Sequence, residues 1–564
     1  MQPKACIRRR HGFSGGDKGT TMTDTPVTGQ PTLAALLHAI TERWGERLMV
    51  QAGDDQASFR EVEARSAAIA RGLLASGVGK GEKVGILFGN GSDWMVAFYA
   101  CVRIGAVAVL LSTFAKPREL AFTIRFGDVR TLVACGGYLG ADYVQRLEEA
   151  FPDLAGQGAE LVMASAPLLR HVWIDAETAP VWSSGRFADL ARAPGAARYT
   201  PALLAAIEAE ITPSDPALII FTSGTTSDPK AVLHNHGAVA RHGQTIASYM
   251  TFAPGDKGLT TMPLFWVGGL IMVMMGANCR GGAFLAPRSP SSGDMLRAIR
   301  DEGASTLQLW PSQMGGLMNH PDWKPEDLQR LRPTSAQQLA LFGLATQEQT
   351  PNSLGMSESL GPHSKEFFDG RLPPGKVGSF GRAIAGVERK IVDPVSGETL
   401  PAGVEGELCI RGYSLMIGYY KKDRSESFDA DGWFHTGDFC IIDADGYLFF
   451  NGRRNEMIKT AGANVAPREV ELLLAAMPGV VEAAVLGLPD ARLGEMVCAV
   501  VLPALGAILD EAALKAALKK ELADYKVPKR IIVLSPDDVP RTDSEKVKKP
   551  VLAKLLAERL AAEG

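Results

Sequence analysis

Between Ser58 and about Ala134, stretches with the apolar period of a helix alternate with short apolar runs. The helical stretches read FREVEARSAAIARGLLASG and SDWMVAFYACVRIG, and the apolar runs read KVGILF, AVAVLL and TLVAC. Short apolar runs of this kind are typical of buried strands, and their alternation with helices is typical of repeated β-α-β units. The sequence therefore predicts an α/β protein with doubly wound, mostly parallel sheets covered by helices on both faces.

Three later stretches extend this pattern. A Pro- and Ala-rich stretch from 166 to 201 is expected to be a loop-rich surface insertion, and the next strand, ALIIFTS, begins at Ala217. The most apolar run, from 264 to 284, is broken by Asn278 and Arg280, so it falls short of the uninterrupted run that a membrane span needs. It is expected to be a buried helix, and no integral membrane segment is predicted.

Changes in composition and in apolar pattern along the sequence divide the chain into three parts. Residues 1–29 are expected to form a disordered extension, because no apolar segment follows its arginines as a secretory signal would require. Residues 30–454 are expected to form a large N-terminal domain that ends, after Pro373, in a small antiparallel β subdomain. Residues 455–564 are expected to form a small α+β domain with a helical tail.

The charge balance and the cysteines exclude several classes of function. The net charge of -4 comes from 59 Lys+Arg against 63 Asp+Glu, which leaves no broad positive field to hold nucleic acid. The 7 cysteines include no C-x-x-C pair, which argues against a disulfide framework and a zinc site. A cytoplasmic location and no nucleic-acid partner are expected, and the oligomeric state is left open, with a homodimer as one option.

The loop FTSGTTSDPK follows an apolar strand and concentrates hydroxyls, glycine and a lysine in one turn. Backbone N–H groups at such turns, with Ser and Thr hydroxyls and a lysine charge, suit a phosphate chain, although a plain polar loop is the alternative. The loop does not match the G-x-x-x-x-G-K-[ST] pattern. The residues expected to contact phosphates are Thr222, Ser223, Gly224, Thr225, Thr226 and Lys230.

This loop resembles the TSGTTGxPKG motif of the adenylate-forming superfamily, which contains acyl-CoA synthetases, luciferases and peptide-synthetase adenylation domains. Ser227 and Ala231 replace the two later glycines of that motif. Four further motifs of the superfamily follow in the same order, so that the resemblance covers nearly the whole chain from about Pro31. Coincidence across five motifs is remote.

Two of these motifs concern the nucleotide. LGMSE resembles YGxTE, and the resemblance implies that Leu354 and Gly355 border the adenine, that Ser357 touches the α-phosphate, and that Glu358 binds Mg²⁺. Leu354 stands where the family usually has an aromatic ring, so the adenine contact is expected to be apolar rather than stacked. GWFHTGD matches the family pattern without alteration, and Asp438 would accept hydrogen bonds from both ribose hydroxyls.

The segment GRRNEMIKTAGANVAPREVE resembles the family motif at the boundary between the two domains. The resemblance implies that Arg453 contacts the ribose and that Asn455 is the hinge about which the C-terminal domain turns. Lys459 and Gly462 would belong to the face that is presented when the thioester forms.

PRTDSEKVKK resembles P[RK]TxxGKxxR and implies a catalytic lysine at Lys546. A solvated charge run with Lys548 and Lys549 is the alternative, but the preceding Pro-Arg-Thr fixes the register. Glu545 replaces the family glycine, so it is expected to threaten the lysine by pairing with it, or the loop by losing a conformation that glycine adopts freely.

PLFWVGG resembles PLFHxxG, which makes Trp266 and Gly269 candidate walls of the acyl pocket, with ordinary core packing as the alternative. The HNH string at 234–236 lacks a second ligand cluster and is interpreted as the entry to a helix. The stretch 334–343 departs from the family's acyl-pocket motif. Fatty, aromatic, steroid-like and carnitine-like acids therefore stay open, with a lean towards an apolar acid.

The resemblance implies an enzyme that uses ATP and Mg²⁺ to convert a small-molecule carboxylic acid to its acyl-AMP and passes the acyl group to coenzyme A, a reaction common in fatty acid metabolism. Two alternatives are kept. One is an acyl-AMP ligase that loads a separate carrier protein. The other is a nucleotide-binding relative that has lost catalysis, which the replacements at Leu354, Ser227 and Glu545 suggest.

Overall fold

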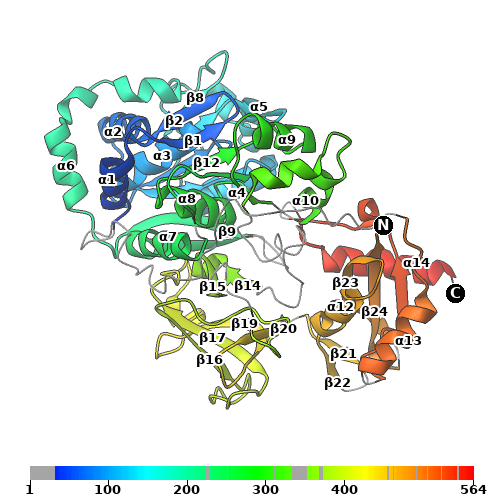
Figure 1. Cartoon of the computed structure of the whole chain (residues 1–564). Helices are drawn as coiled ribbons and strands as arrows, with labels where there is room; N and C mark the ends of the chain where they lie inside the picture. Colours follow the sequence, from blue (N-terminus) through cyan, green and yellow to red (C-terminus); the bar gives the residue numbers. More distant parts are fainter. Residues whose placement is uncertain are drawn as a thin grey trace.

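The computed structural model describes residues 32–222, 229–250, 252–309, 311–332, 352–366, 372–453, 456–460, 463–490, 492–504, 506–522, 524–542 and 545–563. Figure 1 shows two sheets with their helices, a smaller antiparallel sheet beneath them, and a C-terminal unit beside both. Among the helices of these ranges, none combines the length and apolar character that a membrane crossing requires.

A seven-stranded sheet has the order β18-β10-β9-β4-β3-β5-β8. The strands from β9 to β8 are parallel, and β10 and β18 join antiparallel at one edge. Every residue of the central strand β4 is buried, as expected for a strand covered on both faces. The strands are β3 (Lys83–Leu87), β4 (Val107–Leu110), β5 (Thr131–Cys135), β8 (His171–Asp175), β9 (Pro216–Thr222), β10 (Lys230–Asn235) and β18 (Gly418–Tyr419).

A five-stranded sheet has the order β13-β11-β12-β1-β2, in which only the β1–β2 pair is antiparallel among the described strands. Its strands are β1 (Leu48–Ala52), β2 (Asp55–Ser58), β11 (Lys257–Thr260), β12 (Ala283–Ala286) and β13 (Thr306–Gln308). Together the two sheets confirm the predicted α/β class with mostly parallel sheets.

Two helices lie between these sheets, and others cover the outer faces. α3 (Ser92–Arg103) buries every residue except Asp93, and it shares one apolar core with α7 (His236–Met250) and with strands of both sheets. The remaining helices of this part are α1 (Leu33–Trp44), α2 (Phe59–Ala75), α4 (Pro117–Phe126), α5 (Tyr143–Ala150), α6 (Pro201–Ala209), α9 (Ser292–Arg300) and α10 (Pro311–Met318).

Two expectations about this part need correction. The stretch expected to be a loop-rich insertion contains β8, whose short run HVWID pairs in parallel with β5 at the sheet edge. The run 264–284 is helical over η5 (Gly268–Met275) and α8 (Gly276–Asn278), but it ends in strand β12. Gly281 has a φ of 71°, a left-handed conformation that ends the helix and turns the chain into that strand.

The predicted antiparallel subdomain has the strand order β16-β17-β19-β20. A separate hairpin of β14 (Ser353–Met356) and β15 (Gly361–Lys365) packs above it. The four strands are β16 (Val387–Val392), β17 (Gly406–Gly412), β19 (Phe434–Ile442) and β20 (Leu448–Arg453).

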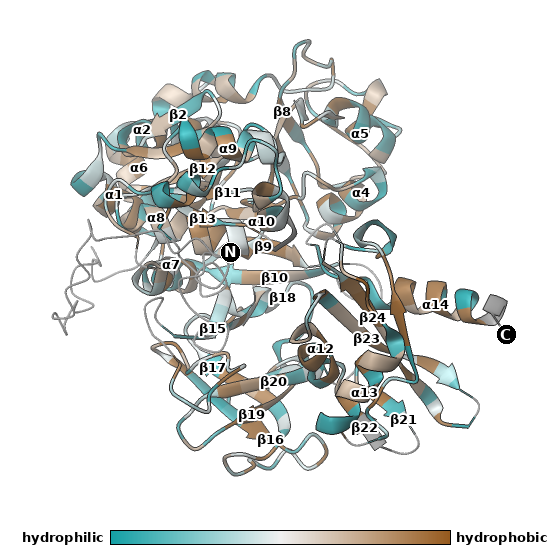
Figure 2. Cartoon of the chain, turned by 45° about the vertical axis from the view of Figure 1, so that its right-hand side comes forward, coloured by the Kyte–Doolittle hydropathy of each residue, from teal (hydrophilic) through white to brown (hydrophobic). Residues whose placement is uncertain are grey.

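The C-terminal unit is an α+β fold around one mixed sheet. Apolar side chains of the long strands β23 and β24 form a core on each face of this sheet, and Figure 2 shows these strands as largely hydrophobic. Its elements are β21 (Ile458–Thr460), β22 (Ala463–Val465), α12 (Pro467–Ala475), β23 (Val480–Asp490), β24 (Gly494–Pro503), α13 (Glu511–Glu521), β25 (Arg530–Val533) and α14 (Lys549–Glu563).

Candidate active site

The predicted phosphate loop connects two paired strands at the edge of the seven-stranded sheet. Thr222 ends β9, Lys230 begins β10, and the two residues lie opposite each other in the antiparallel register. The candidate residues 223–226 between them lie outside the described residues. The Lys230 ammonium lies 4.9 Å from the centroid of the Tyr419 ring, a distance that suits a cation–π contact.

The LGMSE segment forms β14 and a single turn, η8 (Ser357–Ser359). Gly355 is required here, because a Cβ at this position would lie 2.3 Å from the backbone of Gly361 on the paired strand. The carbonyl of Ser357 lies 2.8 Å from Nε2 of the buried His234, which comes from β10. Leu354 packs against the apolar core of the antiparallel subdomain. The hairpin therefore holds Ser357 beside the strand that carries Lys230.

Glu358 is held from two directions by the segment that leads into β18. Its carbonyl oxygen accepts a hydrogen bond of 2.8 Å from the Met416 N–H. Its carboxylate oxygen Oε1 accepts a hydrogen bond of 2.6 Å from the Tyr419 hydroxyl. Burial and the neighbouring Glu358 raise the pKa of Tyr419, so the phenol keeps its proton and donates it to the carboxylate.

Asp438 lies on β19, opposite Arg453 on β20. Its side chain is 3% exposed, and Arg453 Nε lies 3.3 Å from its Oδ1. That oxygen nevertheless has no hydrogen-bond partner among the described residues. Burial raises the pKa of Asp438 to about 6, although the Arg453 charge lowers it. A buried carboxylate oxygen without a donor suits a ligand that supplies hydroxyl groups.

Lys546 comes from the C-terminal unit and reaches the same place. The residue as a whole is exposed, yet burial of its charged group by the surrounding protein lowers its pKa, and the charge of Arg453 acts in the same direction. The carboxylates of Glu358, Glu456 and Asp438 act in the opposite direction. The lysine thus lies within electrostatic reach of residues from the hairpin, from the antiparallel subdomain and from the start of the C-terminal unit.

The loop that carries Lys546 is a tight turn closed by hydrogen bonds between Thr542 and Lys546, of which the Thr542 N–H to Lys546 O bond is 2.8 Å. Glu545 has a φ of 60°, the left-handed conformation that the family's glycine adopts freely. The expectation that the loop loses this conformation without a glycine is wrong, because Glu545 adopts it. Among the ion pairs of the described residues, none joins Glu545 to Lys546.

A pocket of about 220 Å³ lies at the carboxyl ends of strands from both large sheets, and Glu545 closes one side of it. Three of its side chains, Phe114, Phe265 and Trp266, form an aromatic group with ring centroids 5.3 to 5.7 Å apart. Crevices at the carboxyl ends of parallel strands are the usual ligand sites of α/β proteins. Gly269 does not line this pocket; a Cβ there would lie 2.2 Å from the Pro263 carbonyl, so Gly269 permits close packing.

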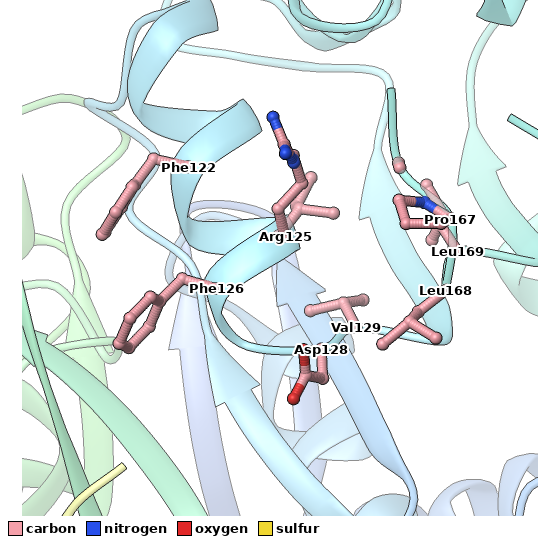
Figure 3. A pocket seen from close by; sticks show the side chains of 10 residues that line it. Phe122, Arg125, Phe126, Asp128, Val129, Pro167, Leu168 and Leu169 are labelled. Atoms are coloured by element: carbon pink, nitrogen blue, oxygen red, sulfur yellow. The ribbon is translucent and has the colours of Figure 1, made fainter. Parts of the chain in front are cut away.

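A larger hollow of about 430 Å³ lies elsewhere, between α4 and residues 166–169 (Figure 3). Phe122 and Phe126 on α4 stack with ring centroids 5.3 Å apart at its border. Because it contains none of the residues that the sequence indicated, it is separate from the candidate site.

The remaining candidates lie apart or outside the described residues. Lys459 is exposed on β21, at the opposite end of the C-terminal unit from α14, the helix that begins just after Lys546 (Figure 1). The candidate hinge Asn455 and the candidate Gly462 lie outside the described residues. The HNH string ends β10 and begins α7, with both histidines buried, as expected for the entry to a helix.

Sequence reasoning missed two residues that support the site, Tyr419 and His234. Both lie on strands at the sheet edge, and each contacts the Ser357–Glu358 turn through an interaction of long sequence separation. The string GYYKK around Tyr419 contains two consecutive tyrosines, and no sequence signal distinguishes the one that faces the site.

The described residues contain no group of three or more His, Cys, Asp or Glu side chains that could hold a metal ion. A cation at this site would therefore rest on few protein ligands. Mg²⁺ fits this condition, because it is commonly held by one or two carboxylates together with phosphate oxygens of the substrate.

Two models of known protein families match most of the chain. The family model of the AMP-binding enzyme matches residues 37–420, and the model of the AMP-binding enzyme C-terminal domain matches residues 469–546. The first match lies in the large N-terminal part of the chain, and the second lies in the C-terminal unit and ends at Lys546.

Curated relatives and solved structures align over nearly their whole lengths. A feruloyl-CoA synthase from Amycolatopsis is 30% identical over 89% of this chain and 94% of its own. A sulfoacetate–CoA ligase from Cupriavidus necator is 29% identical over 92% of this chain and 96% of its own. The structure of ATP-bound MatB from Rhodopseudomonas palustris has a TM-score of 0.76 and 27% identity, over 93% of this chain and 98% of its own.

Proposed function

Because the chain belongs to the AMP-binding enzyme family, we propose that it activates a carboxylic acid with ATP and transfers the acyl group to coenzyme A. It is an AMP-forming acid–CoA ligase. The observation that carries this function is that Lys546 lies within electrostatic reach of Glu358 and Asp438, which come from two other parts of the fold. Two relatives named as CoA ligase or CoA synthase, 29% and 30% identical, align with most of the chain.

In the first step, a carboxylate oxygen of the acid attacks the α-phosphorus of ATP, and the bond to the bridging oxygen of pyrophosphate breaks. Two anions must meet, so catalysis depends on positioning and on neutralising charge. We assign Lys546 to the space between the carboxylate and the α-phosphate. Thr222, Lys230 and residues 223–226 would hold the outer phosphates, and Asp438 and Arg453 the ribose. The adenine would pack on Leu354 and Gly355.

Mg²⁺ would neutralise phosphate charge in this step. Glu358 is the proposed protein ligand, and Ser357 beside it would contact the α-phosphate. The residues fit this role, because Tyr419 engages one carboxylate oxygen of Glu358, while the other has no hydrogen-bond partner among the described residues. A hard cation prefers such carboxylate oxygens.

In the second step, the thiol sulfur attacks the acyl carbon, AMP leaves with the bonding electrons, and the thiol proton passes to solvent. We propose that the C-terminal unit turns near Asn455 for this step, withdrawing Lys546 and presenting Lys459 and Gly462. The separation of β21 from α14 supports such an exchange of faces. The thiol would enter from the side of the pocket that Glu545 closes in the present arrangement.

We propose an acid with an apolar body as the substrate, fatty or aromatic. The aromatic group of Phe114, Phe265 and Trp266 supports this choice, because it offers apolar surface in the pocket that Glu545, the chain neighbour of Lys546, also lines. One polar side chain of the same pocket is already engaged: the Asn90 amide donates to Met262 O at 3.0 Å and accepts from Leu264 N–H at 2.9 Å. A co-crystal structure with an acyl-AMP mimic whose acyl group lies among polar side chains would contradict this proposal.

The test is CoA-dependent release of AMP and pyrophosphate over a panel of fatty, aromatic, steroid-like and betaine-type acids. Lys546→Ala should lower the adenylation rate on the order of 10²-fold or more while ATP still binds, since charge stabilisation in the transition state is lost. Lys548→Ala is the matched control, because Lys548 is exposed in the same charge run. Equal losses in the two variants would contradict the role of Lys546, and pyrophosphate release without acyl-CoA would contradict CoA as the acceptor.

A further inference from the structure

The segment that contains Tyr419 connects two parts of the candidate site. Its backbone is bonded to β10, because Ile417 N–H donates to Leu233 O and Tyr420 N–H donates to Ala231 O, both at 2.8 Å. One residue earlier, Met416 N–H donates to the carbonyl of Glu358 at 2.8 Å. The segment therefore fixes the strand that begins with Lys230 relative to the turn that carries Glu358.

The side chain of Tyr419 makes the same connection at closer range. Its hydroxyl donates to Glu358 Oε1 at 2.6 Å, and its ring faces the Lys230 ammonium at 4.9 Å. A carboxylate with one oxygen held by a donor has a defined orientation, and its second oxygen then points in a defined direction. An ammonium over a tyrosine ring is likewise restricted to one side of the strand.

We propose that Tyr419 is a positioning residue of the ligase, which orients the Glu358 carboxylate towards the cation of MgATP and holds it at a fixed place relative to Lys230. This inference rests on the proposed role of Glu358 as a Mg²⁺ ligand. Tyr419 itself touches neither the reacting carboxylate nor the α-phosphorus in this assignment. It acts through Glu358, as outer partners of metal ligands do.

The neighbouring tyrosine provides a matched control. Tyr420 follows Tyr419 on the chain, but its hydroxyl points to the other side and donates to Asp128 Oδ2 at 2.8 Å. Its ring lies against Phe126, near the hollow of Figure 3. The variants Tyr419→Phe and Tyr420→Phe each remove one partly buried phenol hydroxyl that donates to a carboxylate. They differ in which carboxylate loses its donor.

The experiment measures ATP binding to the full chain by calorimetry, in excess Mg²⁺ and in EDTA. Tyr419→Phe should weaken binding in Mg²⁺ by about 10-fold, the lower end of the range for partners of metal ligands, and leave binding in EDTA unchanged. Tyr420→Phe should change neither value. Equal weakening of Tyr419→Phe with and without Mg²⁺, or no weakening at all, would overturn the inference.

Glu358→Gln separates this inference from the function on which it rests. If Glu358→Gln removes the gain in affinity that Mg²⁺ gives and Tyr419→Phe does not reduce it, the role of Tyr419 is wrong and that of Glu358 holds. If Glu358→Gln keeps the whole gain, the proposed metal ligand is wrong. Adding Tyr419→Phe to Glu358→Gln should cause no further loss, because Tyr419 acts through that carboxylate.

Discussion

Asp438 illustrates how a single residue combines sequence motif and environment. The intact GWFHTGD motif predicted a carboxylate for the ribose, and the strand pair β19–β20 buries that carboxylate beside Arg453. Burial raises its pKa to about 6, above the ordinary range of aspartate. The folded protein therefore binds this proton more tightly than the unfolded chain does. The group stabilises the fold at low pH, and that contribution is lost as the pH rises through 6.

The affinity for ATP should change with pH in the opposite direction and increase as the pH rises, because the ionised form of Asp438 is the better acceptor for ribose hydroxyls. Between about pH 7 and about pH 5 we expect the affinity to fall by about 10-fold, as most of the carboxylate becomes protonated. The measurement is a calorimetric titration with ATP across this range. Asp438→Asn should bind more weakly at neutral pH and should lack this part of the pH dependence, while it retains the part due to the phosphates. Parallel pH profiles of the two proteins would contradict the assignment.

At the scale of elements, the lysine loop shows a local conflict between sequence and backbone. Glu545 occupies a left-handed conformation, with a φ of 60°, that costs a residue with a side chain more than it costs glycine. The turn holds it there through two hydrogen bonds, from Glu545 N–H to Thr542 O at 2.9 Å and from Arg541 Nη1 to Glu545 O at 2.8 Å. The strain is therefore borne by the loop that presents Lys546.

Glu545→Gly should stabilise this turn by about 1 kcal/mol, the relief of strain less the entropy of a more flexible unfolded chain. Hydrogen exchange of the Lys548 amide, which donates to Pro540 O at 2.8 Å, reports on the turn. We expect exchange to slow by about 5-fold in the glycine variant. Glu545→Ala is the control, since it removes the charge and keeps the strain. Slower exchange in both variants to the same extent would assign the effect to the charge instead.

At the scale of the whole molecule, three buried histidines lie where the main parts of the large domain meet. His234 comes from β10, His242 from α7 and His363 from β15, and all three have no exposed surface. Burial lowers their pKa values to about 4, about 3 and about 3. They are therefore neutral in the folded protein, and the unfolded chain takes up protons more readily than the folded one.

This difference predicts acid sensitivity. The stability that these histidines contribute is complete above the ordinary histidine pKa and is lost as the pH falls towards 4, amounting to about 2 kcal/mol per histidine at about pH 5. Urea unfolding, followed by tryptophan fluorescence at about pH 7 and at about pH 5, measures this loss of stability. His242→Gln should reduce the difference in stability between the two pH values, because it removes one buried neutral imidazole. An unchanged difference in His242→Gln would contradict the role of that histidine.

Local sequence patterns were enough to predict the class of fold, because the helical period and the short apolar runs are local properties of the chain. The sequence also predicted the types of residue at the site and the register of Lys546, because motifs fix short spacings. It failed where local signals were weak. The strand β8 is a run of five residues inside a Pro- and Ala-rich stretch, and β12 continues an apolar run that begins as a helix.

Which of these residues meet depends on the packing of segments that lie far apart in the sequence. Strand pairing set Tyr419 towards Glu358 and Tyr420 towards Asp128, a choice that depends on register and that two adjacent tyrosines cannot reveal. The packing of the C-terminal unit brought Lys546 within electrostatic reach of Glu358 and Asp438, which lie far from it in sequence. These contacts follow from the burial of apolar faces that lie far apart in sequence, and the buried environment, rather than residue type, sets the pKa values on which the chemistry depends.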